Sequence, residues 1–348
     1  MSFSTMTGTE RVLTVLHHQE PDRIPTFEWD IDVGVIKAMT GQESVEGFVE
    51  AMDHDAVITR PDYSKTPLGD NLYRNEWGVV IQKSPEHHDM PIHAQAPIKT
   101  WEDFERWQMP AADAPGHFET LKRYIQRFKG KKAIFIQTRD VFAHPRDLLG
   151  YEQFLVDCLQ RPDLVRAIVD KTVEHSIRVV QIAAELGAEV VMTGDDIADK
   201  RSTLISPRVW ENLFLPAFRR FVAGIHDAGL MYWKHSDGNL MKVMDGIVEA
   251  GIDGIDPVDP LAGMDLATFK QRWGSRVAIK GNVDCAYLLV TGSEEQVVKR
   301  VRECIRIAGL GGGYALSSSN TIHSGVRPEL YRAMLRTLRE DGVYPLKI

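Results

Sequence analysis

The sequence predicts an α/β protein, a single (β/α)8 barrel of the TIM type that spans residues 1–348 and carries an insertion between its second and third strands. Eight short apolar segments, rich in valine, isoleucine and aromatic residues, are separated by stretches of helical periodicity, which is the repeat of this fold. Most of them lack a strict polar–apolar alternation, as expected of parallel strands covered on both faces. Several end in polar clusters, and in a barrel these ends are open to substrate.

The expected strands lie at residues 23–29, 55–60, 132–138, 189–194, 229–234, 251–257, 276–281 and 313–318. No G-x-G-x-x-G segment follows an early strand, which disfavours the open sheet of dinucleotide-binding proteins. Residues 61–112 are polar and contain proline, and residues 72–82 within them alternate enough for an extra hairpin. We therefore expect an insertion at the barrel mouth.

Helix boundaries are expected between the strands. Thr7 and Glu10 have the spacing of a capping box that opens an N-terminal helix. Residues 163–186 carry apolar side chains at helical spacing. Further helices are expected from Pro207 to about residue 227 with a kink at Pro216, after a second capping box at Ser293 and Gln296, and from Pro328 to near Gly342.

Composition excludes several classes of protein. The formal net charge of -8 argues against a broad nucleic-acid surface, which needs clustered Lys and Arg. The three cysteines are too few and too scattered for a disulfide framework and fit a reducing compartment. Residues 1–20 lack the apolar core of a signal peptide, and no apolar run approaches the roughly 20 residues that span a bilayer. We expect a cytoplasmic protein without a membrane segment, whose oligomeric state stays open.

The expected fifth strand is followed by His235 and Asp237. A spacing of two in an extended segment places both side chains on the same side. Such a pair can ligate a metal or act as acid and anion, which predicts a catalytic role for both residues. The alternative is that Asp237 caps a helix starting near Gly238 while His235 only bonds the main chain.

Two further polar clusters follow the seventh and eighth strands. Cys285 near a histidine is a natural zinc ligand, although a buried, inert thiol is the common alternative. His323 is either a third metal ligand or a substrate contact, and Asn320 is a candidate substrate contact. The predicted metal ligands are therefore His235, Cys285 and His323.

Charged residues at the other strand ends complete the expected site. Asp195 and Asp196 follow the fourth strand, and because neighbours in an extended segment point apart, only one is expected to face the site; turn formation is the alternative. Asp195 is the third predicted catalytic residue. Arg is the usual clamp for carboxylates. The predicted substrate-binding residues are Glu28, Asp30, Arg60, Arg139, Asp196 and Asn320.

These residues together give the chain a family resemblance. It resembles the uroporphyrinogen decarboxylase superfamily, which includes corrinoid-dependent methyltransferases, from residues 10–25 through residues 323–334. The most specific segments are KHSDGNLMKVMDGIVEAGIDGIDP (234–257) and KGNVDCAYLL (280–289). The resemblance implies a (β/α)8 barrel.

The two branches of that superfamily differ where this chain is informative. True decarboxylases carry an M-R-Q-A-G-R stretch after the first strand that grips porphyrinogen carboxylates, whereas this chain has the acidic TFEWDIDVG (26–34). The resembling methyltransferases bind zinc through His-x-Cys after the fifth strand and a Cys after the last. His235 matches the first ligand, Asp237 stands in place of the Cys, and Asn320 falls near the last Cys. Cys285 and His323 are the expected replacement ligands.

The resemblance therefore predicts a zinc-dependent methyltransferase that moves a methyl group from a small methylated substrate to a corrinoid. The chain contains no D-x-H-x-x-G corrinoid signature, so a separate corrinoid protein is the expected partner. The alternative is a cofactor-free decarboxylase or lyase of porphyrin metabolism that uses Asp195, Asp237 or Glu28 to stabilise a cation or relay a proton. A third possibility is a barrel that only binds a tetrapyrrole or a partner.

Overall fold

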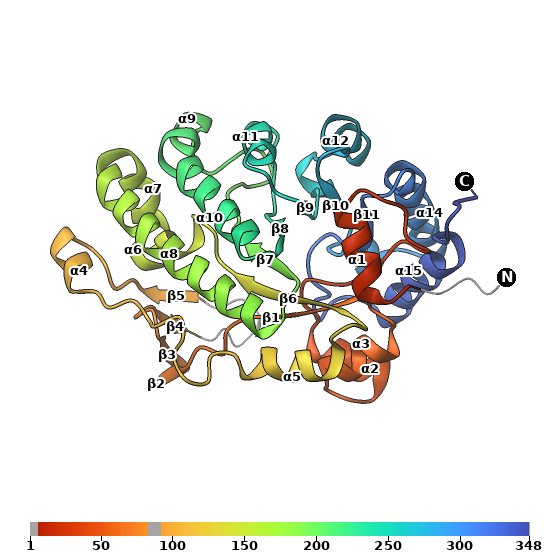
Figure 1. Ribbon diagram of the computed structural model, residues 1–348, viewed down its shortest axis with the longest axis horizontal. Coiled ribbons are helices and arrows are strands. Elements are labelled where there is room, and N and C mark those ends of the chain that lie inside the picture. The colour runs from red at the N-terminus through yellow and green to blue at the C-terminus, as the bar shows by residue number, and fades with distance from the viewer. Residues whose placement is uncertain (1–5, 83–91, 348) are drawn as a thin grey trace.

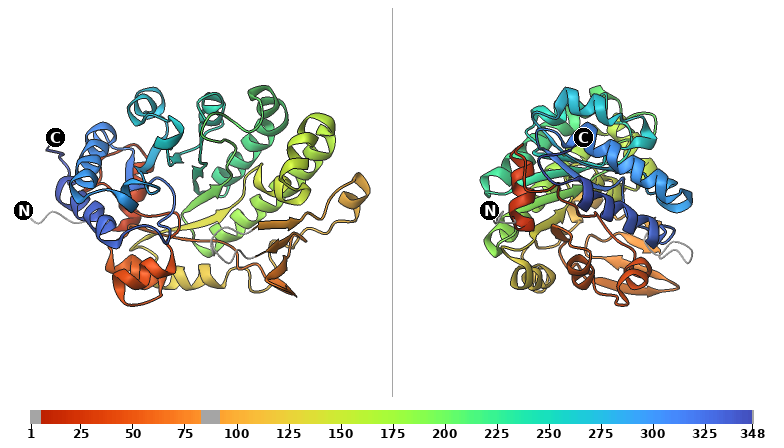
Figure 2. Two further views of the ribbon diagram at one scale, coloured as in Figure 1. Left: turned by 180° about the vertical axis from the view of Figure 1, so that it is seen from behind. Right: turned by 90° about the vertical axis from the view of Figure 1, so that its right-hand side faces the viewer.

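A curled parallel sheet forms the centre of the computed structural model, which describes residues 6–82 and 92–347 (Figure 1). Its strand order is β1-β6-β7-β8-β9-β10-β11, and all neighbours are parallel. The strands are β1 (Ala56–Thr59), β6 (Ala133–Thr138), β7 (Val190–Gly194), β8 (Met231–His235), β9 (Gly254–Asp256), β10 (Ala278–Val283) and β11 (Tyr314–Ser318). Figure 2 shows that helices cover the outer side of this sheet. Seven of the eight expected strands are thus confirmed within about three residues at each end.

The first expected strand, residues 23–29, is not a regular strand. Thr26 makes only an isolated parallel bridge to Leu316 of β11. The oxygen of Pro25 accepts from Leu316 N at 3.0 Å, and that of Thr26 accepts from Asp55 N, just before β1, at 2.8 Å. Pro25 has no N–H to donate to a ladder, so the segment connects the two sheet edges through single hydrogen bonds.

The helices begin and end close to the predicted residues. Both donors of the capping box are satisfied at the start of α1, where Thr7 Oγ1 accepts from Glu10 N at 3.2 Å. The expected kink at Pro216 is a π-helical turn, η1, because a proline at that point cannot supply the main-chain donor. The helices are α1 (Gly8–Leu16), α2 (Val33–Thr40), α3 (Val45–Ala51), α4 (Trp101–Arg106), α5 (Glu119–Phe128), α6 (Ala143–Leu149), α7 (Tyr151–Gln160), α8 (Pro162–Leu186), α9 (Pro207–Val209), η1 (Trp210–Phe214), α10 (Leu215–Asp227), α11 (Met244–Glu249), η2 (Pro260–Ala262), α12 (Leu266–Trp273), α13 (Leu288–Thr291), α14 (Glu294–Cys304), η3 (Ile305–Gly309) and α15 (Pro328–Asp341).

The segment between β1 and β6 contains a second, antiparallel sheet. Its order is β2-β3-β4-β5, with β2 (Lys65–Gly69), β3 (Leu72–Asn75), β4 (Val80–Gln82) and β5 (Ile92–Gln95). The hairpin expected at residues 72–82 is confirmed as the β3–β4 pair, in which Tyr73 lies opposite Ile81. Figure 1 shows this sheet beside α6 and away from α14 and α15.

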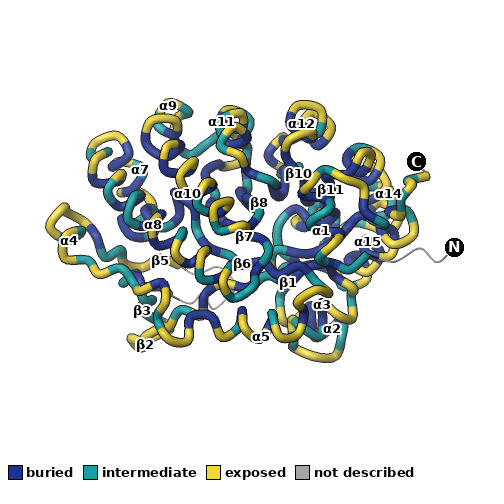
Figure 3. The backbone as a smooth tube through the Cα atoms, in the orientation of Figure 1, coloured by how far each residue is buried: buried dark blue, intermediate teal, exposed yellow. Residues whose placement is uncertain are grey.

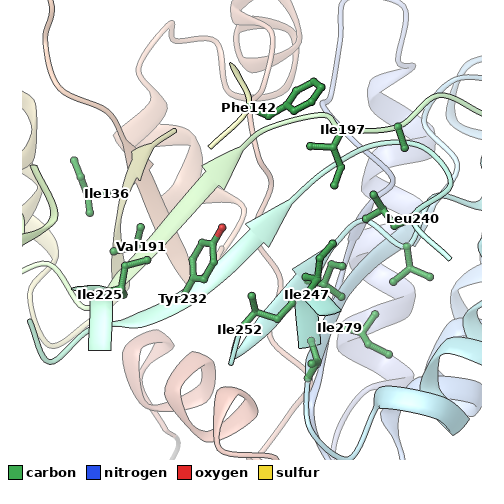
Figure 4. Close-up of a cluster of buried hydrophobic side chains, with 14 of the residues drawn as sticks. Ile136, Phe142, Val191, Ile197, Ile225, Tyr232, Leu240, Ile247, Ile252 and Ile279 are labelled. Atoms are coloured by element: carbon green, nitrogen blue, oxygen red, sulfur yellow. The ribbon is translucent and has the colours of Figure 1, made fainter. Parts of the chain in front are cut away.

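Side chains alternate between two buried layers on the two faces of the central sheet. On β6, for example, Phe135 belongs to the inner cluster, and Ile134 and Ile136 to the larger cluster beneath the helices. Figure 3 shows the buried chain concentrated along these strands, and Figure 4 shows part of the larger cluster, including Tyr232. The inner cluster includes Val12, Val15 and Leu16 of α1, so this helix packs against the start of the strands, at the end opposite the polar clusters.

None of the helices among residues 6–82 and 92–347 combines the length and apolar character needed to cross a membrane.

We predict that Phe27→Ala lowers the free energy of unfolding by about 3–5 kcal/mol. Phe27 is fully buried in the inner cluster, where its ring packs at 5.0 Å from Phe135 and 5.5 Å from Trp233. Chemical denaturation measures the change. The control Leu159→Ala, at a side chain that is 72% exposed, is expected to change stability by no more than about 0.5 kcal/mol. Equal effects of the two substitutions would show that residue 27 does not help to fill the sheet interior.

Candidate active site

The polar clusters meet at the carboxyl ends of the parallel strands. His235 is the last residue of β8, Asp195 and Asp196 follow β7, and Cys285 follows β10. Parallel neighbours place these ends at the same edge of the sheet. The expectation that His235 and Cys285 share one end of the fold therefore agrees with the structure.

One group among the described residues has the geometry of a metal site: Asp196, His235 and Asp237. One ligand atom from each lies within 4.8 Å of the others. Nε2 of His235 is 3.6 Å from Oδ1 of Asp237 and 4.0 Å from Oδ1 of Asp196. Asp237 N donates to Asp196 Oδ1 at 2.9 Å, which fixes the two carboxylates relative to each other.

The orientation of His235 is set by Asp256 at the end of β9. Nδ1 of His235 lies 2.7 Å from Oδ2 of Asp256, and Nζ of Lys280 donates to Oδ1 of Asp256 at the same distance. Although burial opposes ionisation, Lys280 and His235 hold the pKa of Asp256 below its usual value. For His235, burial opposes the charged form, but Asp256 and Asp237 outweigh it and raise the pKa. With Nδ1 engaged, Nε2 is the nitrogen that faces Asp196 and Asp237.

An indole ring covers the imidazole of His235. Trp29 stacks on it with a centroid distance of 4.3 Å and an interplanar angle of 18°. The ring fits because residue 194 is glycine: a Cβ built there would lie 2.5 Å from Cζ2 of Trp29. Trp29 therefore shields one face of His235 from water.

Asp237 is held between His235 and Asn320. The side-chain amide of Asn320 donates to Oδ2 of Asp237, which leaves Oδ1 facing the imidazole. Burial raises the pKa of Asp237 to about 7. His235 opposes this rise, and the negative charge of Asp196 adds to it. Asp237 can therefore hold a proton near neutral pH when no metal is bound.

The two neighbouring aspartates after β7 point in different directions. Asp195 is fully buried, and its Oδ2 accepts from the main-chain N–H groups of Asp140, Phe142 and Ala143 at 2.9–3.1 Å. Although burial opposes ionisation, hydrogen bonding and Arg139 hold the pKa of Asp195 below its usual value. Asp196 instead has a half-exposed side chain in the metal-like group. Asp195 thus orders the turn that carries Arg139.

The acidic side chains of residues 26–34 are engaged with the protein itself. Glu28 is buried and accepts from Ser318 Oγ at 2.6 Å, and burial raises its pKa to about 7. Asp32 caps α2, and exposed Asp30 pairs with Arg60 at 3.4 Å. Each of these three carboxylates therefore has a partner within the protein.

Cys285 and His323 lie near each other but outside the metal-like group of described residues. Nε2 of His323 is 3.0 Å from the main-chain oxygen of Cys285, and the thiol of Cys285 is 3.5 Å from Ser319 Oγ. Burial raises the pKa of this thiol to about 11. The geometry thus brings His235 together with Asp196 and Asp237, and not with the other two predicted ligands.

The Asp196, His235 and Asp237 side chains fit a divalent metal. Ligand atoms about 2.0–2.2 Å from a tetrahedral zinc ion lie roughly 3.3–3.6 Å apart, close to the separations found here. A carboxylate on the second nitrogen of the histidine, here Asp256, is the usual support of such a ligand. Three protein ligands leave a position for substrate.

Three residues around His235 were not among the predicted site residues: Asp256, Lys280 and Trp29. A signal was present for the first two, since each is a charged residue inside an otherwise apolar strand segment. Buried charges of this kind need partners of opposite sign, and adjacent parallel strands supply them. Nothing in the sequence indicates the stacking of Trp29.

A curled parallel sheet with a supported carboxylate–histidine group at its carboxyl edge defines an α/β protein of the TIM-barrel type with the site geometry of an enzyme. The particular family follows from comparison. Residues 81–340 match the uroporphyrinogen decarboxylase (URO-D) family, and the chain belongs to it. The expected superfamily membership is confirmed.

Relatives in this family include both expected branches. The chain is 28% identical over 184 residues to a methylated-thiol–coenzyme M methyltransferase of Methanosarcina mazei, covering 52% of this chain and 46% of the relative. It is 26% identical over 172 residues to a uroporphyrinogen decarboxylase of Hordeum vulgare, covering 48% of each. These matches thus span about half the length of the relatives. A solved methyltransferase from Methanosarcina mazei has the same fold, with a TM-score of 0.78 and 19% identity over 96% of this chain and 99% of that one.

We predict that the purified protein binds one divalent metal and that His235→Ala and Asp237→Asn each weaken its affinity about 10-fold or more, because the first removes a ligand and the second removes a ligand's negative charge. Asp256→Asn is expected to weaken it by about 10–100-fold through loss of orientation. Elemental analysis and chelator competition measure these changes.

The matched control is Asp245→Asn, whose carboxylate pairs with Arg272 and Trp273. Cys285→Ser and His323→Ala decide whether the two other predicted ligands contribute. Absence of metal after incubation with zinc under reducing conditions would contradict the site.

We predict that Glu28→Gln changes the pH dependence of stability. Because the folded-state pKa is raised from 4.5 to about 7, the protonated side chain contributes stability that is complete below pH 4.5 and is lost as the pH rises toward 7. Relative to the variant, the wild type should lose roughly 1–3 kcal/mol between these pH values and no more above them. Urea unfolding at pH 5 and pH 8 tests this, and parallel curves would refute it.

Proposed function

We propose that this chain is a metal-dependent methyltransferase that moves a methyl group from a small methylated substrate to the corrinoid of a separate protein. The supporting observation is the Asp196–His235–Asp237 group with Asp256 behind it, in a family whose relatives include methyltransferases. Such a group suits transfer chemistry because it leaves a ligand position for the substrate heteroatom.

Each residue of the group has a distinct part in this proposal. His235, Asp196 and Asp237 would hold the metal, which when bound acts as a Lewis acid that makes the departing oxygen, nitrogen or sulfur a better leaving group. Asp256 keeps Nδ1 of His235 engaged so that Nε2 stays directed at the site. Trp29 excludes water from one face of the imidazole.

The acceptor of the methyl group would come from the partner. The carbon–heteroatom bond of the substrate breaks, its methyl group is taken up by cobalt(I), and the heteroatom gains a proton. The relatives include a methylcobamide:CoM methyltransferase of Methanosarcina barkeri, which supports a corrinoid as the acceptor.

Closure of the sheet into the expected eight-membered barrel is also part of the proposal. We infer that residues 23–29 act as the eighth member of the ring and that residues 1–348 work as one domain. The hydrogen bonds of Pro25 and Thr26 to opposite sheet edges support closure.

A cofactor-free decarboxylase or lyase is the second candidate. It is favoured by the pKa of about 7 of Asp237, which suits a general acid. The absence of arginine from residues 26–34 argues against an octacarboxylate substrate in that loop.

We predict that the zinc-loaded protein methylates cob(I)alamin with a small methyl donor and that His235→Ala abolishes turnover beyond background, because the leaving group is no longer activated. Loss of the cob(I)alamin absorbance under anaerobic conditions measures the rate.

The Asp245→Asn variant serves as the control for this assay. Conversion of uroporphyrinogen at about 1 per second or more, with no methyl transfer, would refute the methyltransferase and favour the second candidate.

A further inference from the structure

A cavity of about 210 Å³ lies between the antiparallel sheet β2–β5 and the end of β6. Its lining includes the side chains of Arg60, Tyr63, Trp77, Arg139, His144 and Asp147. The region appears in Figure 1 where β4 and β5 approach α6. The insertion therefore supplies one wall and the central sheet the other.

Two guanidinium groups line this cavity without strong carboxylate partners. Arg139 donates through Nη1 to the oxygen of Gly194, and among the described residues it makes no other hydrogen bond. Its neighbour Asp195 is 4.0 Å away and already accepts from three main-chain N–H groups. Arg60 has an exposed pairing with Asp30 at 3.4 Å. Since a guanidinium carries five donors, both residues retain donors for an anion.

The remaining lining combines aromatic rings with aliphatic and neutral polar side chains. Trp77 stacks on His144 at 3.8 Å, and Tyr63 packs edge-on to Trp77 at 6.2 Å. Burial lowers the pKa of His144 well below its usual value, so this ring adds no charge near neutral pH. The one acidic lining group, Asp147, is paired with Arg146 at 3.0 Å and His93 at 3.2 Å. The unbalanced charge of the lining is therefore positive.

The cavity is joined to the metal-like group through Gly194. Its carbonyl accepts from Arg139, and its Cα faces the Trp29 ring that stacks on His235. Asp196 follows two residues later in the chain. A ligand held by Arg139 thus lies next to the elements that position His235.

We propose that this cavity binds the carboxylate-bearing end of a small, one-ring aromatic methyl donor, with the carboxylate on Arg139 and Arg60 and the ring against Tyr63 and Trp77. The size agrees, because an apolar cavity of about 150 Å³ admits one benzene ring, and 210 Å³ leaves room for a substituent but not for a tetrapyrrole. Arginine binds carboxylates through two parallel hydrogen bonds. The inference rests on the proposed function, since it names the substrate class of that site.

The test compares two probes that differ only in the carboxylate group, 4-methoxybenzoate and methoxybenzene. Titration calorimetry and quenching of tryptophan fluorescence are expected to show the benzoate binding about 10-fold or more tightly, and less so at high salt. Arg139→Gln and Arg60→Gln should each remove most of this preference. Arg139→Lys keeps the charge but not the planar fork, so its preference for the benzoate should lie between that of the wild type and that of Arg139→Gln.

The control Arg220→Gln, at an exposed residue paired with Asp170, is expected to bind like the wild type. Circular dichroism checks that the Arg139 variants are folded, and Arg60, which is 65% exposed, provides a variant with little structural burden. Failure of the wild type to bind 4-methoxybenzoate, equal affinity for both probes, or unchanged binding by both arginine variants would overturn the proposal.

Binding needs neither metal nor cob(I)alamin, so the two proposals fail separately. Binding of the benzoate that depends on both arginines, with no methyl transfer from it or from any other small methyl donor, would support carboxylate binding by the arginines and refute the methyltransferase. Methyl transfer from neutral donors, without binding of the benzoate, would support the methyltransferase and overturn the assignment of this cavity.

Discussion

The carboxylate of Asp256 connects a buried lysine inside the sheet, Lys280, to the candidate metal ligand His235 at the sheet edge. It is fully buried and takes one hydrogen bond from Lys280 and one contact from His235. An isolated charge there would cost several kcal/mol, so Lys280 is needed to keep the carboxylate ionised. The ionised carboxylate in turn fixes the imidazole, and the imidazole fixes where Asp196 and Asp237 can share a metal. Removal of either partner of this pair leaves the other as an uncompensated charge inside the sheet.

Most of the fold could be predicted from the sequence because its signals are local. Apolar runs, capping boxes and the prolines at helix starts identify seven strands and the main helices, since each depends on a few consecutive residues. Residues 23–29 have the same composition as a strand, yet Pro25 interrupts the ladder, and only the neighbouring edges decide how far pairing extends. The insertion became a four-stranded sheet because β2 and β5 pair with a hairpin that the sequence did reveal.

The candidate site was less accessible to sequence reasoning. His235, Asp237 and Asp196 follow adjacent strands, so the fold alone predicts that they meet. The choice of Cys285 and His323 as ligands rested on residue type and on the family pattern. In the structure Cys285 contacts Ser319, and His323 contacts the main-chain oxygen of Cys285. Which side chains can share a metal ion depends on their direction, and that direction depends on packing between segments far apart in the sequence. The stacking of Trp29 over His235 is possible only because a glycine stands on β7.

Gly194 has a consequence beyond making room for an aromatic ring. One residue touches both the guanidinium that lines the cavity and the indole that covers His235, and it lies two residues before Asp196. A movement of the main chain at this residue would shift all three groups together, so it would couple an occupant of the cavity to a metal ion held by Asp196, His235 and Asp237. Any factor by which an occupant of the cavity tightens metal binding is, by reciprocity, the factor by which metal tightens that occupant. The end of β7 would be the element that carries this coupling between the two sites.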